Sequence, residues 1–206
     1  MDTILRTDSS LSTRVGCAAP PAGEGVNDAV LALASLSRAL EGNAKLCDLG
    51  ALIWMLLRQI VPADSLALFL PDDEQDHVVV RYAAGLHAAA ILGVTRPTET
   101  GIAGWSAVNL RSVLNAEPSL DLGFRAESDP ALRACVVIPL AEGEALVAVL
   151  GLYSQTVNGF TEDHLRLLEV LGPRLASALV DVAIADEDSR VFPVSVPRPL
   201  RLVQGT

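Results

Sequence analysis

The sequence predicts an α+β domain built on an antiparallel sheet, with helices covering at least one face. Strand-like runs stand in two pairs, residues 65–70 with 77–82 and residues 133–140 with 145–154, and a short charged turn joins each pair. That arrangement is typical of antiparallel hairpins. Helical periodicity is found mainly before the first pair and after the last. The strands are too apolar to face water, so helices must cover them.

The size and charge of the chain exclude several classes of protein. It has 206 residues, of which 50% are hydrophobic and 19% charged, so it can bury a core and is not wholly disordered. There are 15 basic and 25 acidic residues, which gives a net charge of −10, and Lys45 is the only lysine. Because neutralising phosphates needs clustered positive charge, we expect no nucleic-acid partner.

The sequence contains no segment that would direct the chain into or through a membrane. Its longest apolar stretches, residues 49–57 and 145–152, fall well short of the ~20 residues of a transmembrane helix. The first residues lack the basic region and long apolar segment of a secretory signal. We therefore expect a cytoplasmic protein without a membrane partner.

Both ends of the chain differ in composition from its middle. Residues 1–25 are rich in Ser, Thr, Gly, Pro and Ala and show no periodicity, which predicts a disordered leader. Residues 188–206 contain three prolines among valines, arginines and leucines, so a helix cannot continue there. We expect an extended tail, either a loose end or a strand-like peptide for a partner. The folded domain is expected over residues 26–187.

Two helices are expected before the first strand. Asn27 can cap a helix over residues 28–40, where apolar residues form a stripe. A second helix is expected from about residue 44 to residue 60, and Pro62 ends it. The strand at 65–70 follows, and the acidic turn after it is expected to be a solvated hairpin tip.

Short elements are expected between the two hairpins. A short helix is predicted over residues 85–93, and a helix start punctuated by glycines over residues 100–108. A short strand follows at residues 112–115, and residues 117–130 are expected to form a long polar loop. These segments connect the first hairpin to the second.

The final helix is expected to begin at Thr161, and its apolar pattern predicts a homodimer. Its leucines are spaced three or four apart, close to a seven-residue repeat, and Pro173 inside the run should kink or loosen it. One helix on a sheet buries one stripe, so a wider stripe leaves apolar area for a second subunit. With the helix at 28–40, it would form a four-helix bundle. The expected interface residues are Leu33, Leu36, Leu168, Leu175 and Leu179.

Several motifs together resemble one known family. Gly101, Gly104 and Trp105 resemble a Gly-x-x-Gly-Trp segment, and residues 132–140 resemble a central strand that ends in Val-Pro-Leu. The other matching pieces are residues 60–64 before the first strand, residues 113–115 followed by Asp121, residues 150–154 and residues 160–163. In this order and spacing they resemble the GAF domain, a sensory module of cytoplasmic signalling proteins, over about residues 28–183.

The resemblance implies a fold and a class of function. The fold is a six-stranded antiparallel sheet with the terminal helices packed on one face. Loops and short helices on the other face enclose a pocket in ligand-binding members. The resemblance also implies frequent dimerisation through the first and last helices. Because fold does not fix function, the resemblance alone does not identify a ligand.

Departures from the family patterns argue against several classes of ligand. Gln155 and Thr156 stand where cyclic-nucleotide-binding members have an Asn-Lys pair, and His164 stands where they have Glu, so cyclic-nucleotide binding is not expected. Residues 86–133 contain no cysteine, which argues against a covalent bilin. The free methionine sulfoxide reductase branch needs an activated cysteine with a nearby resolving partner. Cys135 is better explained as a small core residue.

The resemblance also suggests which residues would line a pocket. The candidates are Phe69, Tyr82, Gly101, Trp105, Asn115 and Asp121. Each has an alternative structural explanation. The glycines either turn helix-start amides toward an anion or permit close packing, and Trp105 is a candidate core residue. The alternative for Asn115 and Asp121 is that they hold a loop together through backbone hydrogen bonds.

The sequence shows no catalytic or metal-binding constellation. His77, His87 and His164 lack the spacing of zinc ligands, although His87 could serve as a haem ligand. There is no nucleophile elbow, P-loop or recognisable carboxylate pair. We therefore expect a protein that is not an enzyme and has no metal or fixed cofactor.

These observations predict a regulatory GAF protein that binds a small molecule and transmits through its terminal helices, without an output domain of its own. A signalling protein is a possible partner. The alternative is a GAF fold without ligand that serves as a dimerisation or protein-docking scaffold. A minor alternative is a free methionine sulfoxide reductase.

Overall fold

The computed structural model describes residues 45–127 and 130–185. The predicted leader, the tail over residues 188–206 and the helix over residues 28–40 lie outside the described residues. Leu33 and Leu36 of the expected dimer interface lie outside them as well.

Six strands form one antiparallel sheet, in the order β3-β2-β1-β6-β5-β4. This confirms the predicted fold class. The strands are β1 (Ser65–Pro71), β2 (His77–Gly85), β3 (Thr95–Pro97), β4 (Val113–Ala116), β5 (Ala134–Glu142) and β6 (Ala145–Ser154). The helices are α2 (Leu46–Ile60), α3 (Ala88–Ile91), α4 (Gly101–Asn109), α5 (Ser119–Leu122), the 3₁₀ helix η2 (Gly123–Glu127) and α6 (Glu162–Ala185).

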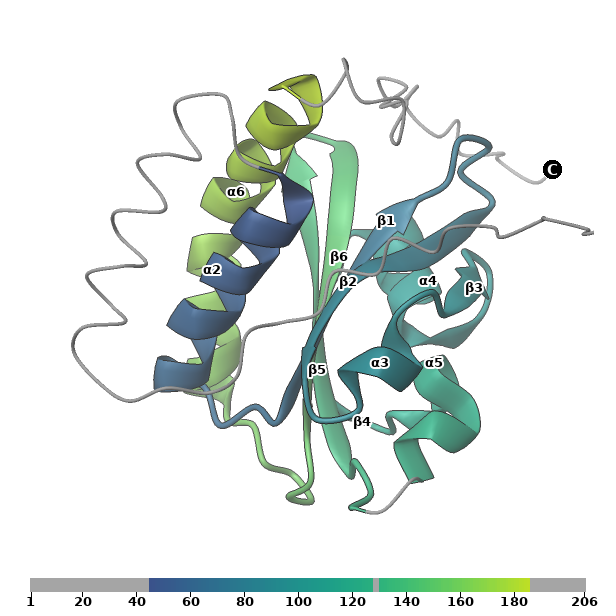
Figure 1. The fold of residues 1–206 in the computed structure, drawn as a ribbon, viewed down its shortest axis with the longest axis vertical. Coiled ribbons are helices and arrows are strands. Elements are labelled where there is room, and N and C mark those ends of the chain that lie inside the picture. The colour runs from purple at the N-terminus through teal and green to yellow at the C-terminus, as the bar shows by residue number, and fades with distance from the viewer. Residues whose placement is uncertain (1–44, 128–129, 186–206) are drawn as a thin grey trace, which may run out of the picture.

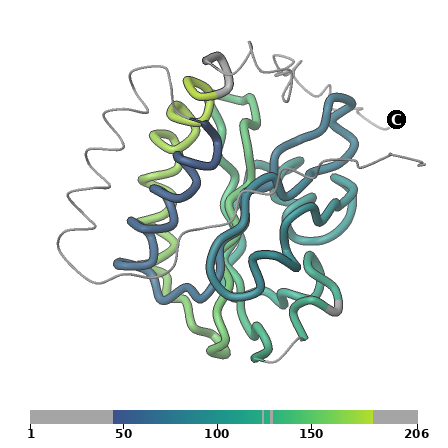
Figure 2. Tube along the Cα trace, in the orientation of Figure 1, coloured from purple at the N-terminus to yellow at the C-terminus, as the bar shows by residue number. Residues whose placement is uncertain are grey.

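The helices lie on both faces of the sheet, which gives three layers (Figure 1). The long helices α2 and α6 lie side by side on one face, as Figure 2 also shows. The short helices α3, α4 and α5 cover the other face. The prediction that the last helix packs on one face, with short elements on the other, is therefore confirmed for the described residues. None of the described helices is long and apolar enough to span a bilayer.

The two faces of the sheet bury separate cores because side chains alternate along each strand. On β1, Leu66 and Leu68 join the core under α2 and α6, whereas Ala67 and Phe69 join the core under α4. All four side chains are fully buried. The central strands therefore cannot face water on either side, and the almost continuous apolar run at residues 65–70 follows from that.

Two expectations about the connecting segments were incomplete. The strand β3 was not predicted, because three residues that include Arg96 and Pro97 show no apolar alternation. The segment expected as a long polar loop contains α5 and η2. Both are too short to display a helical period in sequence.

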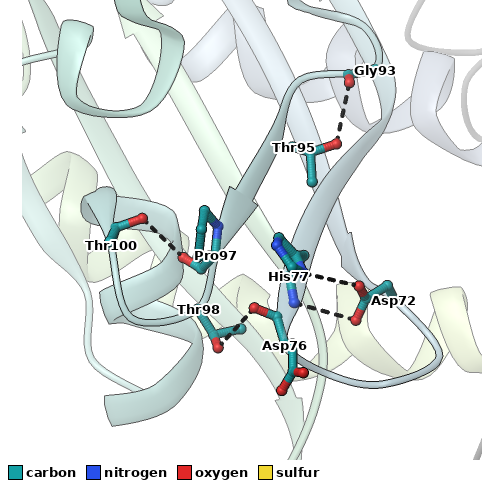
Figure 3. Close-up of polar contacts among 8 residues, drawn as sticks. All are labelled: Asp72, Asp76, His77, Gly93, Thr95, Pro97, Thr98 and Thr100. Atoms are coloured by element: carbon teal, nitrogen blue, oxygen red, sulfur yellow. Dashed lines mark hydrogen bonds and ion pairs between the residues drawn. The ribbon is translucent and has the colours of Figure 1, made fainter.

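Polar contacts hold β3 against the tip of the β1–β2 hairpin (Figure 3). The backbone amide of Thr98 donates to the carbonyl of Asp76 at 2.8 Å, and its hydroxyl donates to the same oxygen at 3.1 Å. Asp72 accepts from the backbone amide of His77 at 3.2 Å and lies 3.3 Å from its Nδ1 atom. The acidic residues thus close a hairpin, as expected. Through Arg96, the same edge positions the residues described below.

Helix α6 runs through Pro173, and one of its faces belongs to the core. Leu168, Ala176, Leu179 and Val182 are buried against the sheet and α2. The prediction that Leu168 and Leu179 form a dimer interface is therefore wrong for these two side chains, which are only 0% and 4% exposed within one chain. Leu175 is partly buried against the same core.

Two helical glycines predict different effects of the same substitution. A Cβ at Gly50 in α2 would lie 2.6 Å from the Tyr82 ring, whereas a Cβ at Gly172 in α6 would meet other elements only at 3.8–4.0 Å. Gly172 precedes Pro173 in the helix, so a new Cβ would crowd the proline ring and offset the gain of about 0.5–1 kcal/mol in helix propensity. We expect Gly172→Ala to leave the free energy of unfolding nearly unchanged. Gly50→Ala should lower it by about 1–3 kcal/mol through overpacking. Urea denaturation measures both, and stabilisation by Gly50→Ala would contradict this packing of α2 on β2.

Candidate functional site

The core beneath α4 contains small residues where the helix crosses the sheet. Ala103 and Ala107 of α4 are buried in the same core as Ala67 and Ala83 of the strands. At Gly151 of β6, a Cβ would lie 2.8 Å from the Tyr153 hydroxyl. The Tyr153 ring therefore leans along β6 over Gly151, and the missing side chain provides its space.

Asp121 joins α5 to the start of α4. Its Oδ1 atom accepts from the backbone amides of Ile102 at 2.7 Å and Ala103 at 3.0 Å, and Oδ2 accepts from Ala103 at 3.2 Å. These are first-turn amides that have no partner within the helix. The carboxylate is fully buried and lies at the positive end of the helix dipole. The helix-start amides thus do face an anion, and the anion is a side chain of the protein itself.

The two glycines of α4 have different structural roles. Gly101 has φ of +74°, and a Cβ there would lie 2.6 Å from Asp121 Oδ1. A Cβ at Gly104 would lie 2.4 Å from the carbonyl oxygen of Pro97 in β3. Gly101 therefore admits the carboxylate, and Gly104 admits the neighbouring strand. Both alternatives considered for these glycines apply, one to each.

Arg96 of β3 is the positive charge beside Asp121. Its Nε atom donates to the main-chain carbonyl of Asp121. Burial is the main influence on the Asp121 carboxyl and raises its pKa, whereas the hydrogen bonds from Ala103 and Ile102 and the charge of Arg96 lower it. Burial has the larger effect, so the net pKa is raised.

Asn115 clamps β4 to the entry of α6. Its side-chain amide donates to the carbonyl of Phe160 at 2.7 Å, and its Oδ1 atom accepts from the Phe160 amide at 3.1 Å. The residue has φ of +52°, a conformation that asparagine tolerates better than most residues. Both ends of the side chain are thus engaged by backbone. Asn115 and Asp121 are therefore better described as residues that hold loops through backbone hydrogen bonds than as residues that contact a ligand directly.

Two buried hydroxyls under α4 lack a hydrogen-bond partner among the described residues. They are Tyr153 Oη on β6 and Ser106 Oγ on α4, and both residues are fully buried. The pKa of Tyr153 is raised by burial and by the nearby Asp121 and Cys135, whereas Arg96 lowers it. Tyr153 and Cys135 are also paired in register across β6 and β5. Tyr153, Asp121, Cys135 and Arg96 therefore form one electrostatic neighbourhood.

Tyr153, Ser106 and Arg96 were not predicted from the sequence. A usable signal was present for Tyr153, because a tyrosine inside the apolar run 145–154 must bury its hydroxyl. For Arg96 there was none, because β3 itself was not predicted.

The structure separates two of the predicted pocket residues from the others. Phe69 lies in the core under α4, but Tyr82 lies on the opposite face of the sheet, in the core with α2. Trp105 is 44% exposed on the outside of α4, so it neither fills the core nor faces Phe69. The prediction that Tyr82 and Trp105 share a pocket with Phe69 is corrected accordingly. Residues 102, 103, 106 and 107 of α4 face the core, whereas Trp105, which lies between them in sequence, faces outward.

The remaining reactive groups have structural partners. His87 Nε2 donates to the carbonyl of Pro130 at 2.8 Å, which joins the start of α3 to the segment before β5. The Cys135 thiol lies 3.4 Å from the carbonyl of Ala116, and burial raises its pKa. The described residues contain no group of three or more His, Cys, Asp or Glu side chains suited to a metal ion.

The Asn115 clamp predicts a graded loss of stability. Asn115→Gly keeps the backbone conformation but removes two hydrogen bonds, so we expect the free energy of unfolding to fall by about 1–3 kcal/mol. Asn115→Ala should lose about 1–2 kcal/mol more, because alanine is strained at positive φ. Chemical denaturation measures both values. Equal stability of Asn115→Gly and the unaltered protein would show that the clamp does not hold α6.

Comparison with known proteins identifies the family. The GAF domain profile matches residues 48–180, which is more than half of the chain. No curated protein matches the chain. Solved structures do match, with sequence identities low enough that they show the fold alone.

Three of these structures illustrate the range of proteins that share the fold. The GAF domain of a phosphoenolpyruvate-protein phosphotransferase from Coxiella burnetii is 19% identical, with a TM-score of 0.58, over 76% of this chain and 95% of that one. The free methionine-R-sulfoxide reductase of Neisseria meningitidis, solved with its substrate, is 17% identical, with a TM-score of 0.55, over 79% and 96%. The second GAF domain of DevS from Mycobacterium smegmatis is 19% identical, with a TM-score of 0.53, over 68% and 95%. The profile match confirms the resemblance seen in the sequence, and the chain belongs to the GAF domain family.

Proposed function

We propose that the chain is a cytoplasmic regulatory GAF domain that binds a small polar molecule between α4 and the sheet and transmits the event to α6. The observation that carries this proposal is the pair of buried hydroxyls, Tyr153 Oη and Ser106 Oγ, left without partners among the described residues. Buried polar groups nearly always have a hydrogen-bond partner. Leaving one unpaired costs about 1–3 kcal/mol. A bound molecule with polar groups would supply the missing partners.

The surroundings of Tyr153 favour a site on this face of the sheet. Tyr153 and Ser106 belong to β6 and α4, two elements that pack against one another. Arg96 and Asp121 add charged groups in the same neighbourhood. Small polar-molecule sites in proteins are mostly apolar with a few polar groups of this kind.

A route from this face to α6 runs through the Asn115 clamp. Asn115 on β4 bonds the backbone of Phe160, two residues before α6 begins at Glu162. A ligand that favours one position of α4 and β4 would therefore shift the start of α6 as well. Such a change is a population shift between two arrangements, driven by the ligand's preference for one of them.

A regulatory role fits the chemistry of Cys135 better than catalysis does. The sulfoxide reductase alternative needs a reactive thiolate, and thiolates form at exposed, electropositive sites. Cys135 is fully buried, and burial together with Asp121 and Glu117 raises the pKa of its thiol. This environment favours an unreactive thiol.

Replacing the unpaired tyrosine hydroxyl tests the proposed site. Native mass spectrometry of the full chain should show a bound small molecule, whose mass is the difference from the denatured chain. Tyr153→Phe should abolish that adduct, yet leave the free energy of unfolding of the ligand-free protein unchanged or slightly higher, because it removes an unpaired buried polar group. Tyr82→Phe is the matched control, since Tyr82 has an unpaired buried hydroxyl on the other face.

The Tyr82→Phe protein should keep the adduct. If no adduct is found, the same proteins are screened by thermal shift against a library of small metabolites. A ligand that stabilises the unaltered protein and the Tyr153→Phe protein equally would contradict this site.

The outer face of α6 favours a second role, dimerisation, which is the role of the scaffold alternative. Val170 is 73% exposed and Leu167 37% exposed, and Leu171 beside them is partly buried. Residues three and four apart lie on one side of a helix. With Leu168 and Leu179 in the core, a homodimer would use the stripe at 167, 170 and 171. We include this interface in the proposal.

A charge placed on this stripe tests the dimer. Sedimentation velocity should show a dimer at roughly tens of micromolar, a concentration at which a standard-sized interface persists. Val170→Glu should give a folded monomer, because a charge cannot be buried unpaired in an interface. Val157→Glu, at a 66% exposed position before α6, is the control and should remain a dimer. Sedimentation of the unaltered protein as a monomer would remove the proposed interface.

A further inference from the structure

We propose that residues 197–203, the docking segment, bind in an extended conformation to an outer patch formed by Trp105, Val108 and Leu120 on α4 and α5 of the same chain. The docking segment lies outside the described residues, and its sequence, charge and distance from α6 along the chain are what assign it to the patch. This docking goes beyond the proposed function and needs no ligand.

The outer surface of α4 is apolar, although the solvent side of a surface helix is normally polar. Of its nine residues only Trp105, Val108 and Asn109 are exposed, and none is charged. Trp105 is 44% exposed and Val108 46%. Because residues three apart lie on the same side of a helix, these two side chains form one apolar stripe.

Leu120 of α5 extends this stripe into a patch. It is 59% exposed, whereas the other three residues of α5 are buried or half-buried. Its carbonyl oxygen lies 3.1 Å from the position of a Cβ on Gly101, about one helical turn before Trp105. Figure 1 shows the two helices next to one another. Adjoining exposed apolar side chains of this kind mark an interaction site.

The size of the outer patch favours an occupant that is already tethered. Each partner in a stable interface contributes about 800 Å², whereas even a fully covered tryptophan accounts for only about 150–250 Å². Three partly exposed side chains therefore fall well below the area that a second copy would need. A segment of the same chain needs less area, because its tether gives an effective concentration on the order of millimolar.

The docking segment has the sequence of a peptide that binds an aromatic surface. It reads Pro-Arg-Pro-Leu-Arg-Leu-Val, and its prolines favour the polyproline II conformation, which has three residues per turn. Pro197, Leu200 and Val203 therefore share one edge, and Arg198 and Arg201 share another. Proline-rich segments in this conformation dock on surfaces lined by aromatic side chains.

The charges of the docking segment and of the domain are complementary. Residues 189–206 contain three arginines and no acidic residue, whereas residues 1–188 contain 12 basic and 25 acidic residues, a net charge of −13. The exposed Glu99 and Glu117 stand two residues before the starts of α4 and α5. Arg111 lies beyond the other end of α4. The arginines of the segment therefore face the helix starts.

The chain between α6 and the docking segment is long enough to reach the outer patch. Helix α6 ends at Ala185, on the face of the sheet opposite α4 (Figure 1). Residues 186–196 span about 34 Å at about 3.1 Å per residue. A domain of about 140 residues has a radius of gyration of about 14 Å, so this length passes from one face to the other. Docking would thus tie α4 to the end of α6.

Limited digestion of the full chain with trypsin tests the docking. Trypsin cleaves after arginine unless proline follows, so it attacks the tail after Arg190 and Arg201 but not after Arg198. Cleavage after Arg201 should be roughly tenfold faster in Trp105→Ser/Val108→Ser than in the unaltered protein. This ratio corresponds to a millimolar effective concentration and a dissociation constant of about 0.1 mM. Cleavage after Arg190, which precedes the segment, should not change.

Quenching of tryptophan fluorescence by acrylamide gives a second readout, from the side of the patch. Trp54 is 8% exposed and Trp105 44% in the domain, so quenching reports mainly on Trp105. Leu200→Glu/Val203→Glu places two charges on the apolar edge and should increase the quenching, because the released segment no longer covers Trp105. Neither variant alters a buried side chain of the described residues, so both should remain folded.

The matched control for the tail is Val191→Glu/Val194→Glu, which adds the same charges at the same spacing before the docking segment. It should leave the quenching as in the unaltered protein. An increase equal to that of Leu200→Glu/Val203→Glu would overturn the assignment of residues 197–203.

Three further outcomes would also decide against the proposal. Equal cleavage after Arg201 in the unaltered and Trp105→Ser/Val108→Ser proteins would overturn the docking, and so would quenching that Leu200→Glu/Val203→Glu leaves unchanged. Protection of Arg201 that disappears on dilution from roughly 100 to 1 µM would overturn the intramolecular contact and assign the patch to the tail of a second copy. Absence of a ligand in the mass spectrum would contradict the proposed function and leave these measurements unaffected.

Discussion

Burial of the central strands on both faces is the constraint on which the rest of the structure depends. Strands β1, β6 and β5 lie between two helical layers, and their side chains are almost all excluded from water. Every polar atom in them must find a partner inside the protein or remain unpaired. Ser65 and Ser154 at the strand ends solve this with bonds to Leu86 and Asp64. The Tyr153 hydroxyl has no such bond among the described residues, which is why it stands out.

The same constraint made the main elements predictable from sequence. Apolar runs that a charged turn separates have few alternatives to a hairpin, so β1, β2, β5 and β6 were located within a few residues. The helices α2 and α6 are long enough to show a period. The strand β3 and the helices α5 and η2 were missed because three to five residues carry no period. Their conformation depends on neighbours such as β2 and α4, which are distant in sequence.

Within the site, the residue types were easier to predict than their partners. Gly101, Asn115 and Asp121 were chosen from the sequence, but it did not show that Asp121 bonds the helix beside Gly101, or that Asn115 bonds Phe160. Trp105 was misplaced because α4 is short and rich in small apolar residues, so no polar stripe indicates its outer face. The leucine spacing of α6 is equally compatible with packing against a sheet and with packing against a partner helix. The structure shows that Leu168 and Leu179 face the sheet.

The two cores differ in a way that bears on where the domain can change shape. Leucines from α2, α6 and the strands fill the core between the long helices and the sheet. In the core on the other face, alanines are prominent, and Leu122 and Leu132 are its only buried leucines among the described residues. Opening a layer costs roughly 25 cal/mol for each Å² of apolar surface that it exposes. Layers held by smaller side chains and a few polar contacts therefore open first. The α4 layer is rich in small side chains and carries two of the three unpaired buried hydroxyls of the described residues. We therefore expect the face of the sheet under α4 to change shape more easily than the face under α2 and α6.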